Sequence, residues 1–385
     1  MFRTLSRFSQ WLERSRKSKR SKCLKGRRRA ARRCSIEQLE DRTVRSGTAV
    51  APFAFAVEGD SLSTVYTGAR ASDGDKSWVQ LLELLRPGAV DIHDFAGDGA
   101  TSSNVALGQS AKVASLVKQG VIHFAVLEIG GNDEKAFLTQ IVAGNFQPFV
   151  NTVVHNIESA LMTVQNAGQV QQVLSLLPDI GLTPSVQAKL NHDPVSLGRI
   201  TTAVNMANQQ LEAFAQAHGI AVVDAVTLGQ LTKQPSITLA GTHTSDFSSP
   251  DGFHPSGIMQ GLFANSAMLA FQTAFGANTS GLQLSDQEIL KSAGDGVQPN
   301  VQTSTFFNVR SFVILPSGVP ASSTNGVASV LSTADTPTAR PLPASGQLPW
   351  LADAQHTSVG SAAVSHASVQ DHTATVDAFF ADFVA

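Results

Sequence analysis

Hydrophobic and polar positions follow two alternating patterns between Ala51 and Gly276. Short apolar runs, typical of strands buried on both faces, are separated by longer stretches in which apolar residues recur at helical spacing. The runs expected to form strands are Phe53–Val57, Val90–Phe95, Phe124–Ile129, Val173–Leu177 and Ile220–Val223. The stretches expected to form helices are Trp78–Leu85, Ser110–Lys118, Phe149–Gln165, Leu197–His218 and a closing Ser256–Phe275. This alternation predicts βαβ units, and therefore an α/β domain with a parallel sheet.

The periodic pattern ends near residue 285. From Asp286 onward the chain is rich in Ser, Thr, Ala, Pro and Gly and has few charges, which predicts a low-complexity tail over 286–385, largely disordered across 300–366. In the final stretch, Thr373–Val384, four apolar residues fall on one side of a helical projection: Val376, Phe379, Phe380 and Phe383. That stretch fits either a short docking or sorting helix or a frayed chain end.

Charge is distributed unevenly along the chain. The net charge is −2, yet residues 1–46 hold about 16 Lys and Arg against about 4 acids. The rest of the chain, here called the body, is therefore acidic. An acidic body has no basic stripe to follow a phosphate backbone, and we expect no nucleic-acid binding by it. Nucleic-acid binding through residues 1–46 alone is a minor hypothesis, tested by deleting that segment.

The basic segment 1–46 begins with positive charge but lacks the apolar stretch of about 7–15 residues found in an ordinary secretory signal. Its end, Ile36–Arg42, resembles the L-E-x-L-E-D-R leader end of many large exported and surface proteins of some bacteria. The resemblance implies export to the periplasm, the cell surface or the medium. The alternative is a solvated, disordered basic arm.

Thiol, metal and membrane chemistry are not expected in the body. Both cysteines, Cys23 and Cys34, lie in the basic segment, and no apolar run approaches the length of about 20 residues that spans a bilayer. The acidic clusters Asp73–Asp75 and Asp94–Asp98 lack the complete calcium-loop pattern. The histidines at 93, 123, 155, 192, 218 and 243 form no ligand spacing, although His243 and Asp246 are candidates to line a pocket near Asp251. We predict no metal and no cofactor.

The first candidate for chemistry is Ser61, in Gly59-Asp60-Ser61-Leu62-Ser63. It comes directly after the first predicted strand, and ligand sites of open α/β sheets gather at the carboxyl ends of strands. The ordinary α/β-hydrolase elbow G-x-S-x-G is absent, because Ser63 occupies the position of the second glycine. Taken alone, Gly-Asp-Ser is also common turn chemistry.

A second group follows the third predicted strand, where Gly130-Gly131-Asn132-Asp133 combines a glycine pair with polar residues. Glycine permits close approach, and the Asn132 side-chain amide is of a kind that donates to a developing oxyanion. The third group is Asp251-Gly252-Phe253-His254-Pro255-Ser256, just before the closing helix. Serine catalysis needs a base and a group that orients the base, and an aspartate three residues before a histidine supplies both locally. Each group is also good turn or helix-cap chemistry.

Taken together and in this order, these groups resemble the SGNH (GDSL-type) hydrolase superfamily over roughly residues 53–275. The resemblance implies a flavodoxin-like three-layer α/β/α fold over 51–285 and a serine esterase or lipase activity. It implies that Ser61 is the nucleophile, His254 the base and Asp251 the residue that orients the histidine. It also implies an oxyanion hole formed by the Ser61 N–H, the Gly99 N–H and the Asn132 amide.

Two positions depart from the family pattern. The family usually has an asparagine shortly before the glycine of its second block, whereas this chain has Asp91–Ala96 there, so Gly97 competes with Gly99 for the oxyanion role. We favour Gly99, because Gly99-Ala100-Thr101 matches the small residues that usually follow. Glu58 immediately precedes Gly59 and either tunes the site from a buried position or points to solvent.

The resulting prediction is a hydrolase that cleaves carboxylic esters through an acyl-serine intermediate. Its substrate is a small-molecule, lipid or carbohydrate ester, whose acyl and alcohol parts the motifs do not identify. The alternative is a surface or matrix protein that keeps the hydrolase fold as a binding module without turnover. The sequence does not indicate an oligomeric state.

Overall fold

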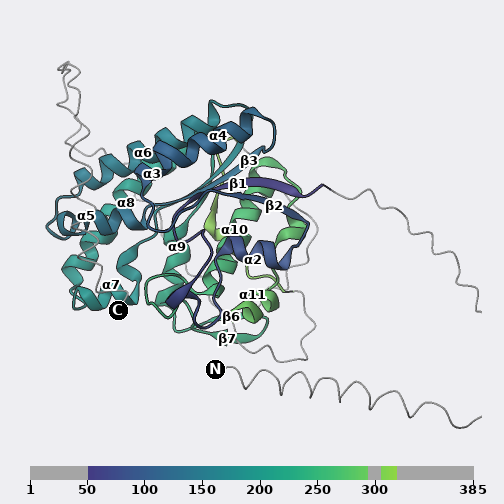
Figure 1. The fold of residues 1–385 in the computed structure, drawn as a ribbon. Helices are drawn as coiled ribbons and strands as arrows, with labels where there is room; N and C mark the ends of the chain where they lie inside the picture. The colour runs from purple at the N-terminus through teal and green to yellow at the C-terminus, as the bar shows by residue number, and fades with distance from the viewer. Residues whose placement is uncertain (1–50, 294–304, 319–385) are drawn as a thin grey trace, which may run out of the picture. The chain divides into compact units, whose positions relative to one another are not determined.

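The predicted apolar runs form one central sheet in the computed structural model, which describes residues 51–293 and 305–318 (Figure 1). Its six strands are ordered β2-β1-β3-β4-β5-β8. Their bounds are β1 Phe53–Gly59, β2 Val90–Asp94, β3 Phe124–Glu128, β4 Gln171–Ser175, β5 Ala221–Val223 and β8 Val313–Ile314. Strands β1 to β5 pair in parallel and β8 pairs antiparallel with β5. The order of the parallel strands is the flavodoxin-like one, which confirms the predicted fold class.

Successive residues of each strand point to opposite faces of the sheet, and both faces are apolar. On β1, Phe55 and Val57 belong to a core shared with α2 (Trp78–Leu85) and α10 (Gly257–Phe275). Ala56 lies in a core on the other face, shared with α4 (Ser110–Lys118). Burial on both faces explains why the strands read as continuous apolar runs. The result is a three-layer α/β/α arrangement (Figure 1).

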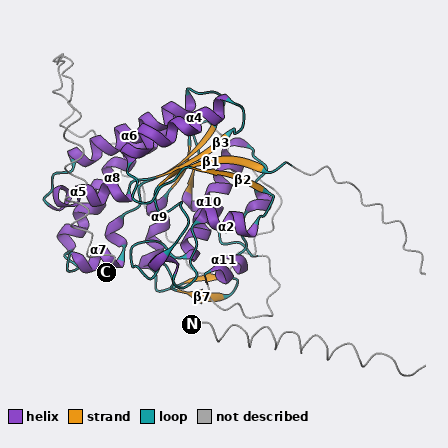
Figure 2. Ribbon diagram, in the orientation of Figure 1, coloured by secondary structure: helices purple, strands orange, loops and turns teal. Residues whose placement is uncertain are grey.

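The helices predicted from periodicity are present with small shifts of their ends, and several short ones are added (Figure 2). On the α4 face lie α5 (Gly131–Val142), α6 (Gln147–Gln165) and α8 (Pro194–Ala217), whose apolar residues pack on Leu127 and Leu174. The remaining short elements are η1 Gly68–Ala71, α3 Ser102–Asn104, η2 Val105–Gln109, η3 Ile180–Leu182, α7 Pro184–Lys189, α9 Ala225–Gly229, η4 Gln230–Lys233, β6 Ile237–Leu239, β7 Thr242–Thr244, η5 Ser280–Leu282, α11 Asp286–Ser292 and η6 Val309–Phe312. None of the described helices has the length and apolar character needed to cross a membrane.

The folded domain extends past residue 285, so the predicted tail boundary is wrong for 286–293 and 305–318. Helix α11 begins with a capping box between Ser285 and Glu288, and the Asp286 carboxylate accepts the Phe307 N–H at 2.5 Å. Val309 and Phe312 of η6 are buried in the α10 core. Tertiary burial, which local composition does not reveal, orders these residues. The predictions for 1–46 and for Thr373–Val384 lie outside the described residues.

The strand order determines where a ligand site can form. After β1 the chain crosses to β2 on one side, whereas β3 lies on the other side of β1, so β1 and β3 flank the point at which the order reverses. The loops that leave the carboxyl ends of such strands diverge to opposite faces and leave a crevice between them. Ser61 follows β1 and Asn132 follows β3, so both lie at this crevice.

Candidate active site

Ser61 occupies a tight turn at the end of β1. A Cβ at Gly59 would lie 2.5 Å from the Glu128 carbonyl oxygen, so only glycine allows β1 and β3 to approach this closely. The Gln109 side chain holds the same residue, accepting from Gly59 N at 2.7 Å and donating to Gly59 O at 2.9 Å. The Asp60 carboxylate then accepts the Leu62 N–H at 2.9 Å. These contacts hold Ser61, which is 8% exposed, at the strand exit.

His254 lies on a compact turn that precedes α10. The Ser249 N–H donates to the His254 carbonyl at 2.8 Å, and Ser248 and Pro255 form an antiparallel bridge. His254 Nε2 lies 2.8 Å from Ser61 Oγ, and His254 Nδ1 lies 2.5 Å from Asp251 Oδ2. The structure therefore brings the predicted nucleophile, base and orienting carboxylate into one hydrogen-bonded chain. Residues 193 positions apart in sequence meet in it.

The Asp251 carboxylate is tied to its own turn. Its Oδ1 accepts the N–H groups of Phe253 and His254, both at 2.9 Å, while Oδ2 faces the imidazole. Partial burial raises the pKa of Asp251, but the hydrogen bond and charge of His254 and the two backbone donors outweigh it and lower the pKa to about 2. Asp251 is therefore ionised at neutral pH, which is the state in which a carboxylate can orient a neighbouring imidazole.

The entry into α5 positions Asn132. Gly130 has φ +131°, a backbone region that L side chains rarely adopt, and a Cβ there would collide with the Leu177 side chain. The Asn132 amide nitrogen donates to the Ala100 carbonyl at 2.9 Å and lies 3.4 Å from Asp60 Oδ2. Its carbonyl oxygen accepts from Lys135 Nζ at 3.5 Å. With Lys135 beside the Asn132 carbonyl oxygen, the Asn132 NH₂ group faces Asp60 in the loop that carries Ser61.

The two candidate glycines of the second block differ in what their N–H groups do. Gly97 N–H donates to the Gly59 carbonyl at 3.1 Å, which commits it to the sheet edge. Gly99 has φ +72°, and its N–H has no hydrogen-bond partner among the described residues. Ser102, just beyond, donates to the Asp133 carboxylate through both N–H and hydroxyl, at 2.8 and 2.7 Å. The Ser102 contacts tie the loop that carries both glycines to α5. Of the two candidates, Gly99 is the one whose N–H the described residues leave free to donate to a ligand.

Residues 56–267 match the family model described as GDSL-like Lipase/Acylhydrolase. The chain belongs to this family. Membership supports ester hydrolysis as the general class of its activity, and it agrees with the resemblance read from the motifs.

Several solved structures are similar to this family member at low identity. They include the lipase Lip_vut3 from a goat rumen metagenome (16% identity, TM-score 0.38, covering 59% of this chain and 100% of that one). The psychrotrophic esterase EstA from Pseudoalteromonas sp. has 16% identity and a TM-score of 0.38, with 58% and 100% covered. The acetyl xylan esterase Axe2 from Geobacillus stearothermophilus has 14% identity and a TM-score of 0.37, with 59% and 97% covered. No curated protein matches the chain, so the family assignment rests on the family model.

Buried carboxyl groups lie beneath Ser61 in this member of the GDSL family. Burial raises the pKa of Asp60 to about 7, against the lowering effect of the Leu62 N–H and the Lys135 charge. Burial likewise raises the pKa of Glu128 to about 8, although it accepts from Ser63 Oγ at 2.5 Å and from the Trp78 indole at 3.0 Å. At neutral pH, Glu128 therefore carries a proton and no charge.

Glu58, left open between a buried and a solvent-facing position, is fully buried. Its side chain lies on the α4 face of β1, and neither carboxyl oxygen has a hydrogen-bond partner of ordinary geometry. The nearby Ser110 hydroxyl instead donates to the Val105 carbonyl at 2.8 Å. Burial raises the pKa of Glu58 to about 8, and Ser110 lowers it in part. Glu58 is therefore a neutral acid in the sheet at neutral pH, away from solvent.

Sequence reasoning missed Arg70, which links the loops around Ser61. It is 7% exposed, its Nη1 donates to the Ser61 carbonyl at 3.3 Å, and its Nη2 contacts both Asp98 oxygens at 2.8 and 2.7 Å. Partial burial raises the pKa of Asp98, but hydrogen bonds from Arg70 and Thr64 lower it below its ordinary value. Asp98 lies between the two candidate glycines, Gly97 and Gly99, but no local sequence pattern pairs it with an arginine 28 residues earlier.

Tyr66 and Gln260 form a second support that the sequence did not reveal. The Gln260 amide donates to the Tyr66 hydroxyl at 2.6 Å and to the Leu62 carbonyl at 3.1 Å. The Tyr66 ring packs edge-on against the His254 ring, with centroids 5.7 Å apart. Helix α10 is thereby joined to the turns that carry both Ser61 and His254.

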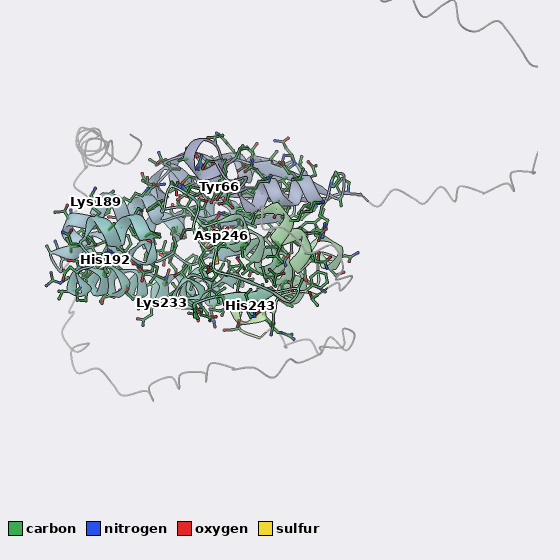
Figure 3. All side chains as sticks on the ribbon, turned by 90° about the horizontal axis from the view of Figure 1, so that it is seen from below. Tyr66, Lys189, His192, Lys233, His243 and Asp246 are labelled. Atoms are coloured by element: carbon green, nitrogen blue, oxygen red, sulfur yellow. The ribbon has the colours of Figure 1, made fainter. Side chains whose placement is uncertain are left out.

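The structure does not place His243 or Asp246 among the residues that line the cavity beside Ser61, so that suggestion is wrong. His243 is exposed on β7, and its Nδ1 lies 3.1 Å from Thr238 Oγ1. In Figure 3, His243 and His192 lie well apart from one another. Among the described residues, no group of three or more His, Cys, Asp or Glu side chains gathers as a metal site would require.

Proposed function

We propose that this chain hydrolyses carboxylic esters through an acyl-Ser61 intermediate. In this proposal His254 is the general base, Asp251 orients it, and the oxyanion donors are the N–H groups of Ser61 and Gly99 and the Asn132 amide. The observation that carries the proposal is the chain of short contacts, 2.8 Å from Ser61 Oγ to His254 Nε2 and 2.5 Å from His254 Nδ1 to Asp251 Oδ2. Such a chain activates a hydroxyl that is otherwise a weak nucleophile.

In the first half of the reaction, Ser61 Oγ attacks the ester carbonyl carbon while its proton passes to His254 Nε2. The carbonyl oxygen becomes an oxyanion, which the three donors stabilise more strongly than the neutral carbonyl. Asp251, ionised because its pKa is about 2, stabilises the imidazolium through Nδ1. The C–O bond to the alcohol then breaks, and His254 returns the proton to the departing alkoxide.

In the second half, water takes the place of the alcohol. His254 removes a proton from the water, the resulting hydroxide attacks the acyl carbon, and the bond to Ser61 Oγ breaks. The serine recovers its proton from His254 and the carboxylic acid leaves. The same three groups serve both halves, so no cofactor enters either step.

The test combines a covalent probe with turnover. A fluorophosphonate probe should label the wild-type protein and a Ser72→Ala control, whose serine is exposed on the surface, but not Ser61→Ala. On p-nitrophenyl acetate, Ser61→Ala and His254→Ala should each lower kcat on the order of 10³-fold or more, with circular dichroism unchanged. Labelling that persists in Ser61→Ala, or a wild-type protein that is neither labelled nor active, would refute the proposal. The second result would favour the binding-module alternative.

A further inference from the structure

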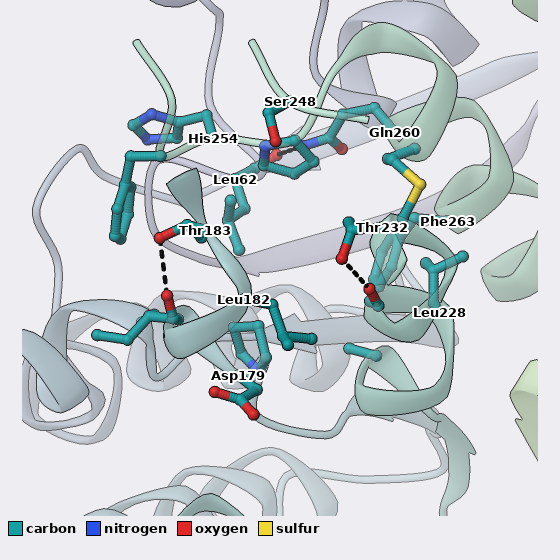
Figure 4. Close-up of a pocket in the computed structure, with 18 of the residues that line it drawn as sticks. Leu62, Asp179, Leu182, Thr183, Leu228, Thr232, Ser248, His254, Gln260 and Phe263 are labelled. Carbon is teal, nitrogen blue, oxygen red and sulfur yellow. Dashed lines mark hydrogen bonds between the residues drawn. The ribbon is translucent and has the colours of Figure 1, made fainter. Parts of the chain in front are cut away.

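A cavity runs from Ser61 and His254 into the domain, between the carboxyl ends of β3, β4 and β5 and helix α10. Its walls come from η3, from α9 and η4, and from the first turns of α10. In Figure 4, His254 and Ser248 lie along one side, and Leu182, Leu228 and Thr232 lie across from them. The apolar lining residues are Leu62, Ile180, Leu182, Ala225, Leu228, Phe247, Met259 and Phe263.

Three of the polar side chains in these walls, those of Thr183, Thr232 and Asp179, are already hydrogen-bonded within the protein. Thr183 Oγ1 donates to the Ile180 carbonyl at 2.7 Å, and Thr232 Oγ1 donates to the Gly229 carbonyl at 2.8 Å (Figure 4). The Asp179 carboxylate accepts from Gly181 N at 2.9 Å and from Thr201 Oγ1 at 2.6 Å. A polar ligand, such as a sugar ring, would lose hydrogen bonds to water along these walls and regain few of them, whereas an apolar chain loses none.

The order of the chemical steps assigns this cavity to the acyl part of the ester. The acyl group stays bonded to Ser61 after the first half-reaction, whereas the alcohol must leave and be replaced by water. An apolar cavity retains a group that stays bonded to Ser61, but it would slow the departure of an alcohol bound in it.

We propose that the cavity binds the acyl chain of the ester, so that this enzyme acts on esters of longer fatty acids in preference to acetyl esters. The proposal rests on the proposed function, because it presumes the acyl-Ser61 intermediate. Each methylene that enters the cavity leaves water, which favours the longer ester by up to about fourfold in kcat/KM per group.

Gly229 offers a way to shorten the cavity without disturbing the catalytic groups. It ends α9 with an ordinary helical φ of −61°, and a Cβ built there would lie 3.5 Å from Leu182 Cδ1, a normal contact. A larger side chain at 229 is therefore free of backbone strain and projects beside another lining residue. Gly198 is the matched control, since it lies exposed on α8, and a Cβ there meets nothing within 4 Å.

The experiment measures kcat/KM for p-nitrophenyl acetate, butyrate, hexanoate, octanoate and decanoate. The wild-type protein and Gly198→Leu should prefer octanoate over acetate by at least about tenfold. Gly229→Leu should lose at least about tenfold on octanoate yet stay within about twofold on acetate. Gly229→Ala, which adds one methyl group, should lose about threefold in kcat/KM on octanoate and keep its activity on acetate. It replaces Gly229→Leu in the test if that variant does not fold.

Three results would overturn the inference. The first is a wild-type enzyme that hydrolyses acetate as well as octanoate, and the second is a Gly229→Leu protein that loses equally on all chain lengths. The third is a length preference that appears instead with acetate esters of methanol, butanol and octanol, which would assign the cavity to the alcohol. In each of these cases, Ser61-dependent hydrolysis persists. If no ester is hydrolysed in a Ser61-dependent way, the proposed function itself has failed.

Discussion

The carboxyl groups of the His254 turn and of the sheet beneath Ser61 have opposite environments. Asp251 is tied to its turn by two backbone donors and an imidazole, and its pKa is lowered to about 2. Glu58, next to the last residue of β1, has no hydrogen-bond partner of ordinary geometry, and its pKa is raised to about 8. The same functional group is therefore charged at one place and neutral at the other.

The difference shows which physical effect dominates at each place. Burial disfavours the carboxylate at both, but donors aimed at the charged form outweigh it only at Asp251. In the His254 turn, these hydrogen bonds keep the Asp251 carboxylate charged beside the imidazole. The sheet accepts a proton instead, because an unpaired charge in a dry core costs far more than a neutral acid.

Replacing a carboxyl by an amide should have its largest effect at Asp251. Asp251→Asn removes the charge that stabilises the imidazolium and exchanges one acceptor oxygen for a donor, so kcat should fall on the order of 10³- to 10⁴-fold with little change in KM. The loss should stay below that of His254→Ala, which removes the base itself. Steady-state kinetics on a short-chain p-nitrophenyl ester measure it. An Asp251→Asn enzyme with wild-type kcat would mean that the short contact to His254 has no role in turnover.

At Glu58 the corresponding change should act on stability. The folded state keeps the Glu58 proton up to about pH 8, whereas the unfolded chain releases it near 4.5, so the folded state binds more protons between these values. The free energy of unfolding therefore falls as pH rises through this window. Glu58→Gln should remove that contribution and flatten the fall by an amount on the order of a few kcal/mol.

Urea unfolding of wild type and Glu58→Gln at pH 5, 6.5 and 8 measures this difference. Glu83→Gln, a change at an exposed position on α2, is the control and should keep the wild-type slope. Equal slopes in wild type and Glu58→Gln would show that Glu58 is ionised in the fold, contrary to the argument from burial.

The smallest effect is expected at Glu128, although this residue lines the cavity beside Ser61. It is neutral at pH 7 because its pKa is about 8, and glutamine has nearly the same shape and keeps an oxygen for the Ser63 and Trp78 donors. Glu128→Gln should therefore keep kcat/KM at pH 7 within about threefold of wild type. A loss as large as that of Asp251→Asn would mean that the Glu128 charge takes part in catalysis.

The sequence indicated the layers of the fold correctly, and three of the residues that it nominated for catalysis, Ser61, His254 and Asp251, lie within hydrogen-bond distance along one chain of contacts. The strands were readable as short continuous apolar runs and the helices as apolar residues that recur about once per helical turn, because both patterns are visible within a few neighbouring positions. Ser61, Asn132 and His254 were recognisable because each follows or precedes such an element with turn residues around it. The Asp251 and His254 contact was readable too, since both residues lie in one short turn.

Packing between distant segments was decided only by the tertiary structure. No local signal joins Arg70 to Asp98, commits the Gly97 N–H to Gly59, or adds β8 to the sheet edge. The apolar cavity likewise draws its walls from η3, α9 and α10, which are far apart along the chain. The protonation of Glu58 follows the same rule, because desolvation is set by everything that surrounds a group rather than by its neighbours in sequence. Local patterns specify which elements form and which chemical groups they carry, whereas burial, pairing and charge state depend on how those elements pack.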